Sequence, residues 1–172
     1  MSRTLTEGGP EEAVAQIRGT GAWLFVPPDD CIGAAVHSFG DVDHKVTWVS
    51  QRILRPGDAA LGIGANLGLV AIAMADAVGT RGHFEAFEPK PRFAELARRS
   101  AEPNRFDQLT LHEVALGRTN AGLTLDIPNE NMGRASIGRS QGADEAIQVL
   151  QRHAGEVLED LALGPIRLIK WI

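Results

Sequence analysis

The sequence predicts an α/β fold built on a doubly wound, mostly parallel sheet, and three observations carry this prediction. An apolar run at Ala59–Ile63 passes directly into a glycine-rich turn and then into an apolar helical pattern at Leu67–Val78. Strand and helix patterns go on alternating as far as residue 116. A second strand pattern, His83–Phe87, ends at the carboxylate of Glu88. Such alternation builds parallel sheets with right-handed crossovers.

Length and composition describe one globular domain. The 172 residues are 44% apolar and 23% charged, which is enough to bury a substantial core. The formal net charge of −5 argues against a nucleic-acid partner, because phosphate backbones attract concentrated Lys and Arg.

The sequence favours a cytoplasmic protein without a membrane segment. The single cysteine, Cys31, forms no internal disulfide, and the N-terminus lacks the apolar core of a secretion signal. The longest apolar tract, 59–75, contains Asn66 and three glycines, whereas a membrane span needs about 20 mainly apolar residues. We interpret this tract as a buried strand and helix.

The N-terminal region is expected to lead into the main domain. Residues 1–21 are predicted to be a flexible tail with a short helix at Glu11–Arg18. The domain then spans 22–172, divided into a lead-in at 22–56 and a core at 57–172.

The lead-in itself has three expected elements. Ala22–Val26 is an apolar strand stopped by two prolines, and Asp29 or Asp30 caps a helix that runs through Val36. Apolar residues at helical spacing predict a second helix from Val42 to Ile53.

Within the core, the helix at Leu67–Val78 is apolar on all sides and should be buried against the sheet. Pro91 is expected to open the next helix and Pro103 to end it. Further predicted segments are a strand at Leu109–Leu116, a half-exposed strand at Leu123–Ile127, an ambiguous segment at Ala146–Leu163 with a helix over Glu156–Leu163, and a strand at Ile166–Ile172.

The polar segment Asn129–Gly142 contains a G-x-S-x-G pattern around Ser140. A nucleophile elbow needs a buried strand before the serine and a helix directly after it, and this context is missing. A polar loop is therefore the favoured interpretation.

The glycine turn and Glu88 together indicate an adenosine-containing cofactor. Gly62, Gly64 and Gly68 permit positive φ and close approach of a ligand to the backbone. The following helix is expected to direct free N–H groups and its positive dipole end toward the turn. A carboxylate at the second strand's end accepts hydrogen bonds from two ribose hydroxyls.

Glycine spacing separates two cofactor classes. The dinucleotide fingerprint is G-x-G-x-x-G, and Leu67 stands where its third glycine belongs, because this chain reads G-x-G-x-x-x-G. The spacing disfavours NAD, while S-adenosylmethionine carries no phosphate and tolerates the bulkier turn. The plain structural alternative is that these glycines only let strand and helix pack closely. No metal site is expected, since the five histidines show no ligand spacing.

Several motifs in order resemble the FkbM family of S-adenosylmethionine-dependent methyltransferases. The resemblance extends from about Val26 to the C-terminus. It is carried by Leu54–Asp58, Gly64–Gly68, Phe87–Pro89, Val114–Gly117 and Leu168–Lys170, the last being similar to the start of the family's Ile-Lys-Ile-Asp-Val-Glu-Gly strand.

This resemblance implies a Rossmann-like, seven-stranded class I methyltransferase domain that methylates an oxygen of a sugar or other small metabolite. Its cofactor would be S-adenosyl-L-methionine and its partner a small-molecule methyl acceptor. The implied cofactor-binding residues are Gly64, Ala65, Asn66 and Gly68 at the methionine and ribose end, Glu88 at the ribose, Val114 and Ala115 near the adenine, and Asp43 facing the cofactor. Catalytic residues, including a general base, are not identified.

Two departures from the family pattern stand out. Gly62, within the same cofactor-binding strand, replaces a usual aspartate, and losing that acceptor should weaken binding by about 1–3 kcal/mol. The Asp-Val-Glu-Gly segment and the last strands are expected to be missing, because Ile172 holds the aspartate's place. Strand 166–172 would then be an exposed edge that favours a homo-oligomer.

Two other functions remain open from the sequence. A non-catalytic truncated remnant or cofactor-binding module is favoured by the two departures. An NAD(P)-dependent oxidoreductase is a weaker alternative, which the position of Gly68 counts against.

Overall fold

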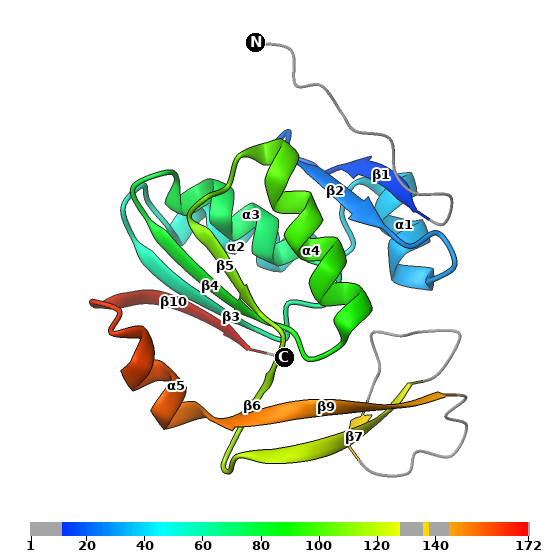
Figure 1. The fold of residues 1–172 in the computed structure, drawn as a ribbon. Helices are drawn as coiled ribbons and strands as arrows, with labels where there is room; N and C mark the ends of the chain where they lie inside the picture. The colour runs from blue at the N-terminus through cyan, green and yellow to red at the C-terminus, as the bar shows by residue number, and fades with distance from the viewer. Residues whose placement is uncertain (1–11, 128–135, 138–144, 172) are drawn as a thin grey trace.

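The computed structural model describes residues 12–127, 136–137 and 145–171. In this part of the chain a central sheet of four parallel strands runs in the order β10-β3-β4-β5 (Figure 1). The strands are β3 (Ala59–Ile63), β4 (His83–Phe87), β5 (Leu109–His112) and β10 (Ile166–Trp171). The predicted α/β fold with a mostly parallel sheet is confirmed.

Helices cover both faces of this sheet. They are α3 (Leu69–Val78), α4 (Pro91–Asn104) and α5 (Ala154–Leu161). Neighbouring strand residues point to opposite faces. Phe84 belongs to the core built around α3, whereas Phe87 packs in a separate cluster with Val157 of α5. The chain is therefore doubly wound, with α5 on the face opposite α3.

The N-terminal region pairs two strands and adds two helices. These are β1 (Ala13–Gln16), β2 (Trp23–Val26), α1 (Cys31–Phe39) and α2 (His44–Ile53). The helix predicted at Glu11–Arg18 is wrong, because residues 13–16 form β1, antiparallel to β2. Ala15 and Ile17 are buried while Gln16 is exposed, which is the two-residue period of a strand. Asp30 caps α1 as expected, accepting from the Ile32 and Gly33 N–H groups.

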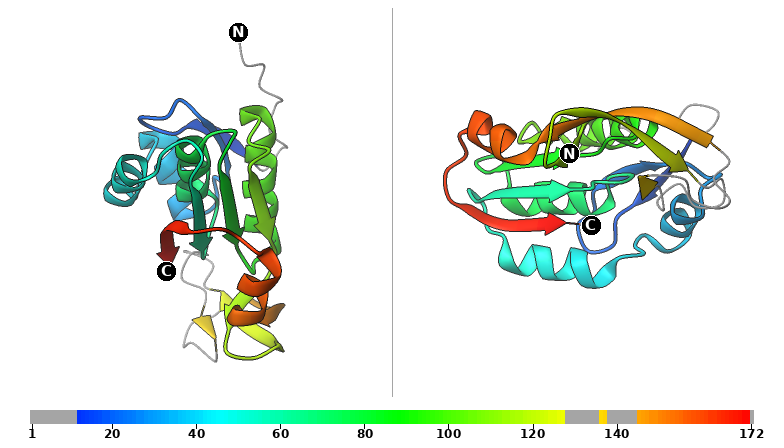
Figure 2. Two further views of the ribbon diagram at one scale, coloured as in Figure 1. Left: turned by 90° about the vertical axis from the view of Figure 1, so that its left-hand side faces the viewer. Right: turned by 90° about the horizontal axis from the view of Figure 1, so that it is seen from below.

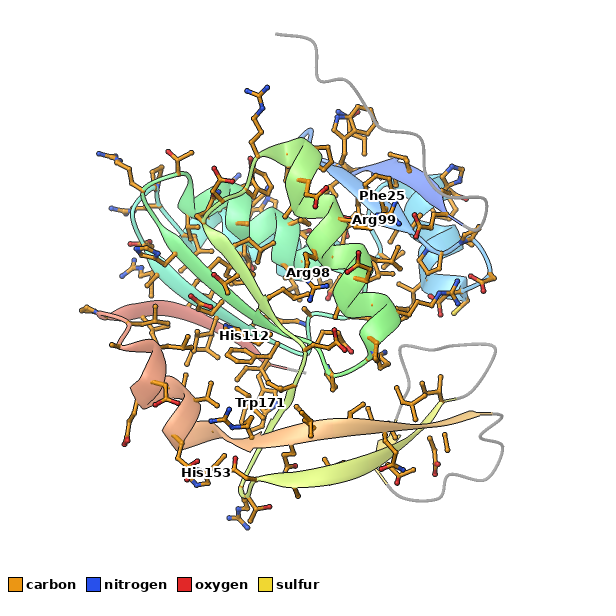
Figure 3. The ribbon with its side chains drawn as sticks, viewed as in Figure 1. Phe25, Arg98, Arg99, His112, His153 and Trp171 are labelled. Atoms are coloured by element: carbon orange, nitrogen blue, oxygen red, sulfur yellow. The ribbon has the colours of Figure 1, made fainter. Side chains whose placement is uncertain are left out.

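Side chains of helix α4 contact the strand β2, and one of these pairs, Arg99 and Phe25, is labelled in Figure 3. Ser100 Oγ accepts the Phe25 N–H at 2.9 Å, and Asn104 both accepts from and donates to the Trp23 backbone. The Arg99 guanidinium lies 4.8 Å from the centre of the Phe25 ring. The outer backbone groups of β2 are thus satisfied without another strand. The helix runs one residue past Pro103, to Asn104, and its C-cap residue is Arg105, whose φ is +57°.

A second sheet in the order β6-β9-β7-β8 lies beyond the carboxyl ends of the central strands (Figures 1 and 2). Its strands are β6 (Ala115–Gly117), β7 (Ala121–Ile127), β8 (Ser136–Ile137) and β9 (Glu145–His153). The single strand predicted at 109–116 is therefore two, because the chain changes sheets after His112. The ambiguous segment from Ala146 begins as a strand, since β9 pairs with β7 from residue 145 to residue 151.

Some expectations lie outside the described residues. These are the tail at 1–10, Ser140 with its G-x-S-x-G pattern, and Ile172. Within the expected loop at 129–142, residues 136–137 form β8. Among the residues that the structure describes, no helix is both long and apolar enough to cross a membrane.

Candidate functional site

The candidate site lies where the strand order reverses. From β3 the chain proceeds to β4 and β5 on one side and later returns to β10 on the other. Doubly wound sheets bind ligands at this switch point, outside the carboxyl ends of the strands. The turn at Gly64–Gly68 begins there, directly after β3.

The turn needs its glycines for conformation and for packing. Gly64 and Gly68 have φ values of +77° and +98°, and Asn66 adopts +54°. A Cβ on Gly68 would lie 2.9 Å from the Cβ of Ala97 in α4. Close packing of the turn against α4 therefore accounts for Gly68, while approach of a ligand to the turn stays a prediction.

Every backbone N–H of this turn already has a partner within the protein. Gly64 and Ala65 both donate to the Phe87 carbonyl at 2.9 Å. Asn66 donates to Glu88, Leu67 to the Asn66 side chain, and Gly68 to the Ala65 carbonyl. The N–H groups of the turn itself are therefore engaged by the Asn66 side chain, the Ala65 carbonyl and the residues at the end of β4. That α3 directs free N–H groups of its first turn toward this site stays a prediction.

Glu88 joins the turn to the next crossover. Its side chain is 3% exposed, and Oε2 accepts the Asn66 N–H at 2.7 Å while Oε1 accepts the Lys90 N–H at 3.1 Å. Its own N–H donates to the His112 carbonyl of β5 at 3.0 Å. A carboxylate has about four acceptor positions. The two backbone bonds leave it capacity for a ligand's hydroxyl groups.

Lys90 lies beside this carboxylate. Its Nζ is 4.0 Å from Glu88 Oε1 and 3.9 Å from the centre of the Phe93 ring. Burial lowers the pKa of Lys90, and the charges of Glu88 and Asp30 oppose that shift.

Lys170 reaches the turn from the other side, from β10. Its Nζ donates to the Gly64 carbonyl at 2.6 Å. Burial lowers the pKa of Lys170, and the charges of Asp43 and Glu88 oppose the shift. Asp43, at the start of α2, makes no side-chain cap bond to its helix. Helix α2 contacts β10, the strand that carries Lys170. That Asp43 faces a cofactor stays a prediction.

Gly62 is buried one residue before the end of β3. A Cβ there would lie 2.8 Å from Cζ of Phe84, a ring with no exposed surface. The Phe84 ring therefore fills the space that a side chain at position 62 would need. Whether Gly62 contacts a cofactor stays a prediction.

Val114 packs in the same apolar cluster as Phe87 and Val157, on the face of the sheet opposite α3. Val114 lines a cavity of about 430 Å³ between β5, β9 and α5, together with Leu111, His112, Glu113, Arg152, Val157, Asp160 and Leu161. Ala115 begins β6 in the second sheet. Figure 3 shows His112 near the carboxyl end of β5, where its ring stacks on Phe87 with 4.8 Å between centroids. The chain connects this cavity to the turn through the Glu88–His112 backbone bond.

The sequence indicated most of the turn but missed both lysines as site residues. Lys170 had one available signal, a charged residue flanked by Ile169 and Trp171 near the end of a predicted strand. Lys90 follows Glu88-Pro89 and directly precedes the first residue of α4. In the part of the chain that the structure describes, no group of three His, Cys, Asp or Glu residues is placed to hold a metal ion.

No protein-family model and no curated protein matches the chain. Similar solved structures include P. horikoshii TYW2 in complex with MeSAdo, at 14% identity and TM-score 0.48, over 63% of this chain and 38% of that one. Precorrin-6y C5,15-methyltransferase from Geobacter metallireducens has 21% identity and TM-score 0.38, over 43% and 40%. Protein-L-isoaspartate O-methyltransferase has 18% identity and TM-score 0.38, over 64% and 32%.

The chain thus spans at most about two fifths of the length of these three proteins. Likeness at this level concerns the arrangement of strands and helices. The fold class of this chain rests on its own strand order.

The Gly62–Phe84 contact predicts a specific stability effect. Gly62→Ala should lower the free energy of unfolding by about 1–3 kcal/mol, because the new methyl group overpacks a filled core. In a Phe84→Leu background the same change should cost less. Denaturant unfolding measures both. Gly122→Ala is the control, since a Cβ there meets no atom within 4 Å. Equal costs for Gly62→Ala in both backgrounds would contradict the prediction.

The lowered pKa of Lys170 predicts a stability trend with pH. In the unfolded chain the pKa returns to 10.5, so between the native value and 10.5 the unfolded state binds more protons. The free energy of unfolding then rises with pH. The wild type should gain stability relative to Lys170→Met as the pH approaches 10.5, measured by urea unfolding. Lys45→Met, at an exposed lysine of α2, is the control, and a difference that is flat or falls with pH refutes the assignment.

Proposed function

We propose that this chain is an S-adenosyl-L-methionine-dependent methyltransferase. The observation that carries the proposal is the Glu88 carboxylate, which lies at the switch point and is bonded to the Asn66 N–H at 2.7 Å. Glu88 follows β4, and it is bonded to the glycine turn that follows β3. A carboxylate in this position suits the two hydroxyl groups of an adenosyl ribose.

The residues present fit this cofactor better than a dinucleotide. All N–H groups from Gly64 to Gly68 are bonded within the protein, so none is ready to bind a pyrophosphate. S-adenosylmethionine carries no phosphate group and needs no such donors. An NAD(P)-dependent oxidoreductase is disfavoured by this feature and by the position of Gly68.

When bound, the cofactor supplies an electrophilic methyl group on a sulfonium. Glu88 would hold the ribose, and the backbone of Gly64, Ala65 and Asn66 would form the floor beneath the methionine and ribose end. Gly68, at the helix start, keeps that floor close to α4. The protein's contribution to such a displacement is alignment of the reactants and stabilisation of shifting charge. We assign no general base among the described residues.

The finer assignment is an FkbM-type enzyme that methylates an oxygen of a sugar or other small metabolite. It is supported by the order of the sequence motifs, above all Gly64–Gly68 followed by Phe87–Pro89. Val114 and Ala115 would lie near the adenine. In this proposal the methyl acceptor is a small molecule, with neither nucleic acid nor membrane as partner.

A non-catalytic cofactor-binding module is the second candidate. One observation favours it: the Phe84 ring occupies the space where a side chain at position 62 would lie. The site would then hold the cofactor without the carboxylate that the FkbM pattern has at position 62. Methyl transfer to any acceptor would exclude this candidate.

Titration calorimetry with S-adenosylmethionine and with NAD tests the proposal. The wild type should bind S-adenosylmethionine, and Glu88→Gln should weaken binding about 10- to 100-fold, since a charged acceptor bond contributes about 1.5–3 kcal/mol. Glu85→Gln is the matched control. Glu85 is also a buried carboxylate, but it lies within β4 and bonds to His112. Binding of NAD without S-adenosylmethionine would refute the proposal.

We also propose that the chain self-associates through β10. This strand is an edge of the four-stranded sheet, and Ile166, Ile169 and Trp171 expose 36%, 51% and 79% of their surface. Unpaired edges with apolar side chains pair with other strands. Light scattering at increasing concentration should show oligomers that Ile169→Lys disperses. A wild type that stays monomeric at high concentration would contradict this.

A further inference from the structure

Lys170 and Glu88 lie on opposite sides of the same turn. Lys170 belongs to β10 and Glu88 follows β4, while the turn between them leaves β3, the strand that separates these two. Lys170 is in register with Gly62, two residues before the Gly64 carbonyl to which it donates. A ligand lying across this turn therefore meets a carboxylate at one end and an ammonium group at the other.

We infer that Lys170 binds the carboxylate of the donor's amino-acid end and so makes the site specific for a carboxylated donor. The inference rests on the proposed function and names a residue that recognises one chemical group of that cofactor. In S-adenosylmethionine the ribose and the amino acid lie on opposite sides of the sulfonium. Glu88 at the ribose therefore directs the amino-acid end toward β10.

The bonding capacity of Lys170 fits this role. A lysine ammonium has three donors, and one of them bonds to the Gly64 carbonyl at 2.6 Å. That bond fixes the ammonium group at the turn and leaves donors for a carboxylate. The side chain is partly buried, and in such surroundings a charge-assisted hydrogen bond is stronger than in water.

Asp43 stands at the start of α2, a helix that contacts β10, the strand of Lys170. Its charge acts on Lys170. An amino-acid end carries an ammonium group beside its carboxylate, and Asp43 supplies the opposite charge for that ammonium. Asp43 also counteracts the effect of burial on the pKa of Lys170, which favours the charged form of the lysine.

Lys90 does not offer the same function. Its ammonium group lies over the Phe93 ring at 3.9 Å, on the β4 side of the turn, and the charge of Asp30 acts on it. It neighbours the carboxylate assigned to the ribose. Of the two lysines at the turn, Lys170 is the one on the β10 side.

The test compares S-adenosylmethionine with its decarboxylated analogue by titration calorimetry on the whole chain. The wild type should bind the carboxylated form about 10- to 100-fold more tightly, the range expected for one hydrogen bond between charged groups. In Lys170→Met this preference should fall to within about threefold, with affinity for the decarboxylated analogue unchanged. Lys170→Arg should keep part of the preference, and Lys45→Met all of it.

The outcomes separate the two proposals. A wild type that binds S-adenosylmethionine but does not distinguish it from the analogue overturns the role of Lys170 and leaves the methyltransferase proposal standing. Equal weakening of both ligands in Lys170→Met, with Lys170→Arg equally weak, also overturns it, since that is the pattern of a structural role. A folded wild type that binds neither ligand overturns both proposals. The wild-type comparison needs no variant to fold.

Discussion

The architecture of the site depends on one buried carboxylate. Glu88 bonds the Asn66 N–H of the β3 turn with one oxygen and the Lys90 N–H with the other, so a single side chain ties two successive crossovers together. A buried charge without partners is strongly unfavourable, and partners of good geometry make it tolerable. The same bonds allow Asn66 to hold its left-handed conformation at φ +54°. The conformation of the turn is therefore fixed by bonds within the protein.

A second constraint comes from the core behind the site. Position 62 lies on β3 beside Ala86 of β4, and its missing side chain leaves room for the Phe84 ring. Protein interiors are close-packed, so a change at one of these positions is felt at the other. Gly62 and Phe84 therefore behave as one packing unit.

The sequence predicted the elements whose local pattern and tertiary setting agree. Strand β3, the apolar helix α3 and strand β4 all follow from apolar runs bounded by glycine or proline. It was wrong at β1, where a helix was predicted, and it left the segment of β9 undecided between strand and helix. Pairing with β2 and with β7 decides both cases, and such long-range pairing is not written in a local window.

The site shows the same division between local and long-range information. Gly64–Gly68 and Glu88 were predictable because adjacency in sequence and the parallel sheet bring them together. Lys170 comes to the Gly64 carbonyl from 106 positions away, and only the pairing of β10 with β3 places it there. The segment Leu168–Lys170, which resembles an FkbM motif, contains this lysine, but the motif does not indicate which group the lysine bonds.

The strand order also gives the site a direction. Because β10 and β4 flank β3, their terminal charges fall on opposite sides of the turn, an ammonium group on one and a carboxylate on the other. Neither strand alone would orient a ligand. Had the chain kept winding in one direction, β10 would not lie beside β3, and Lys170 would not reach the Gly64 carbonyl. In the proposed binding mode, the topological switch therefore lets this turn, whose own N–H groups are all engaged, distinguish the two ends of a ligand.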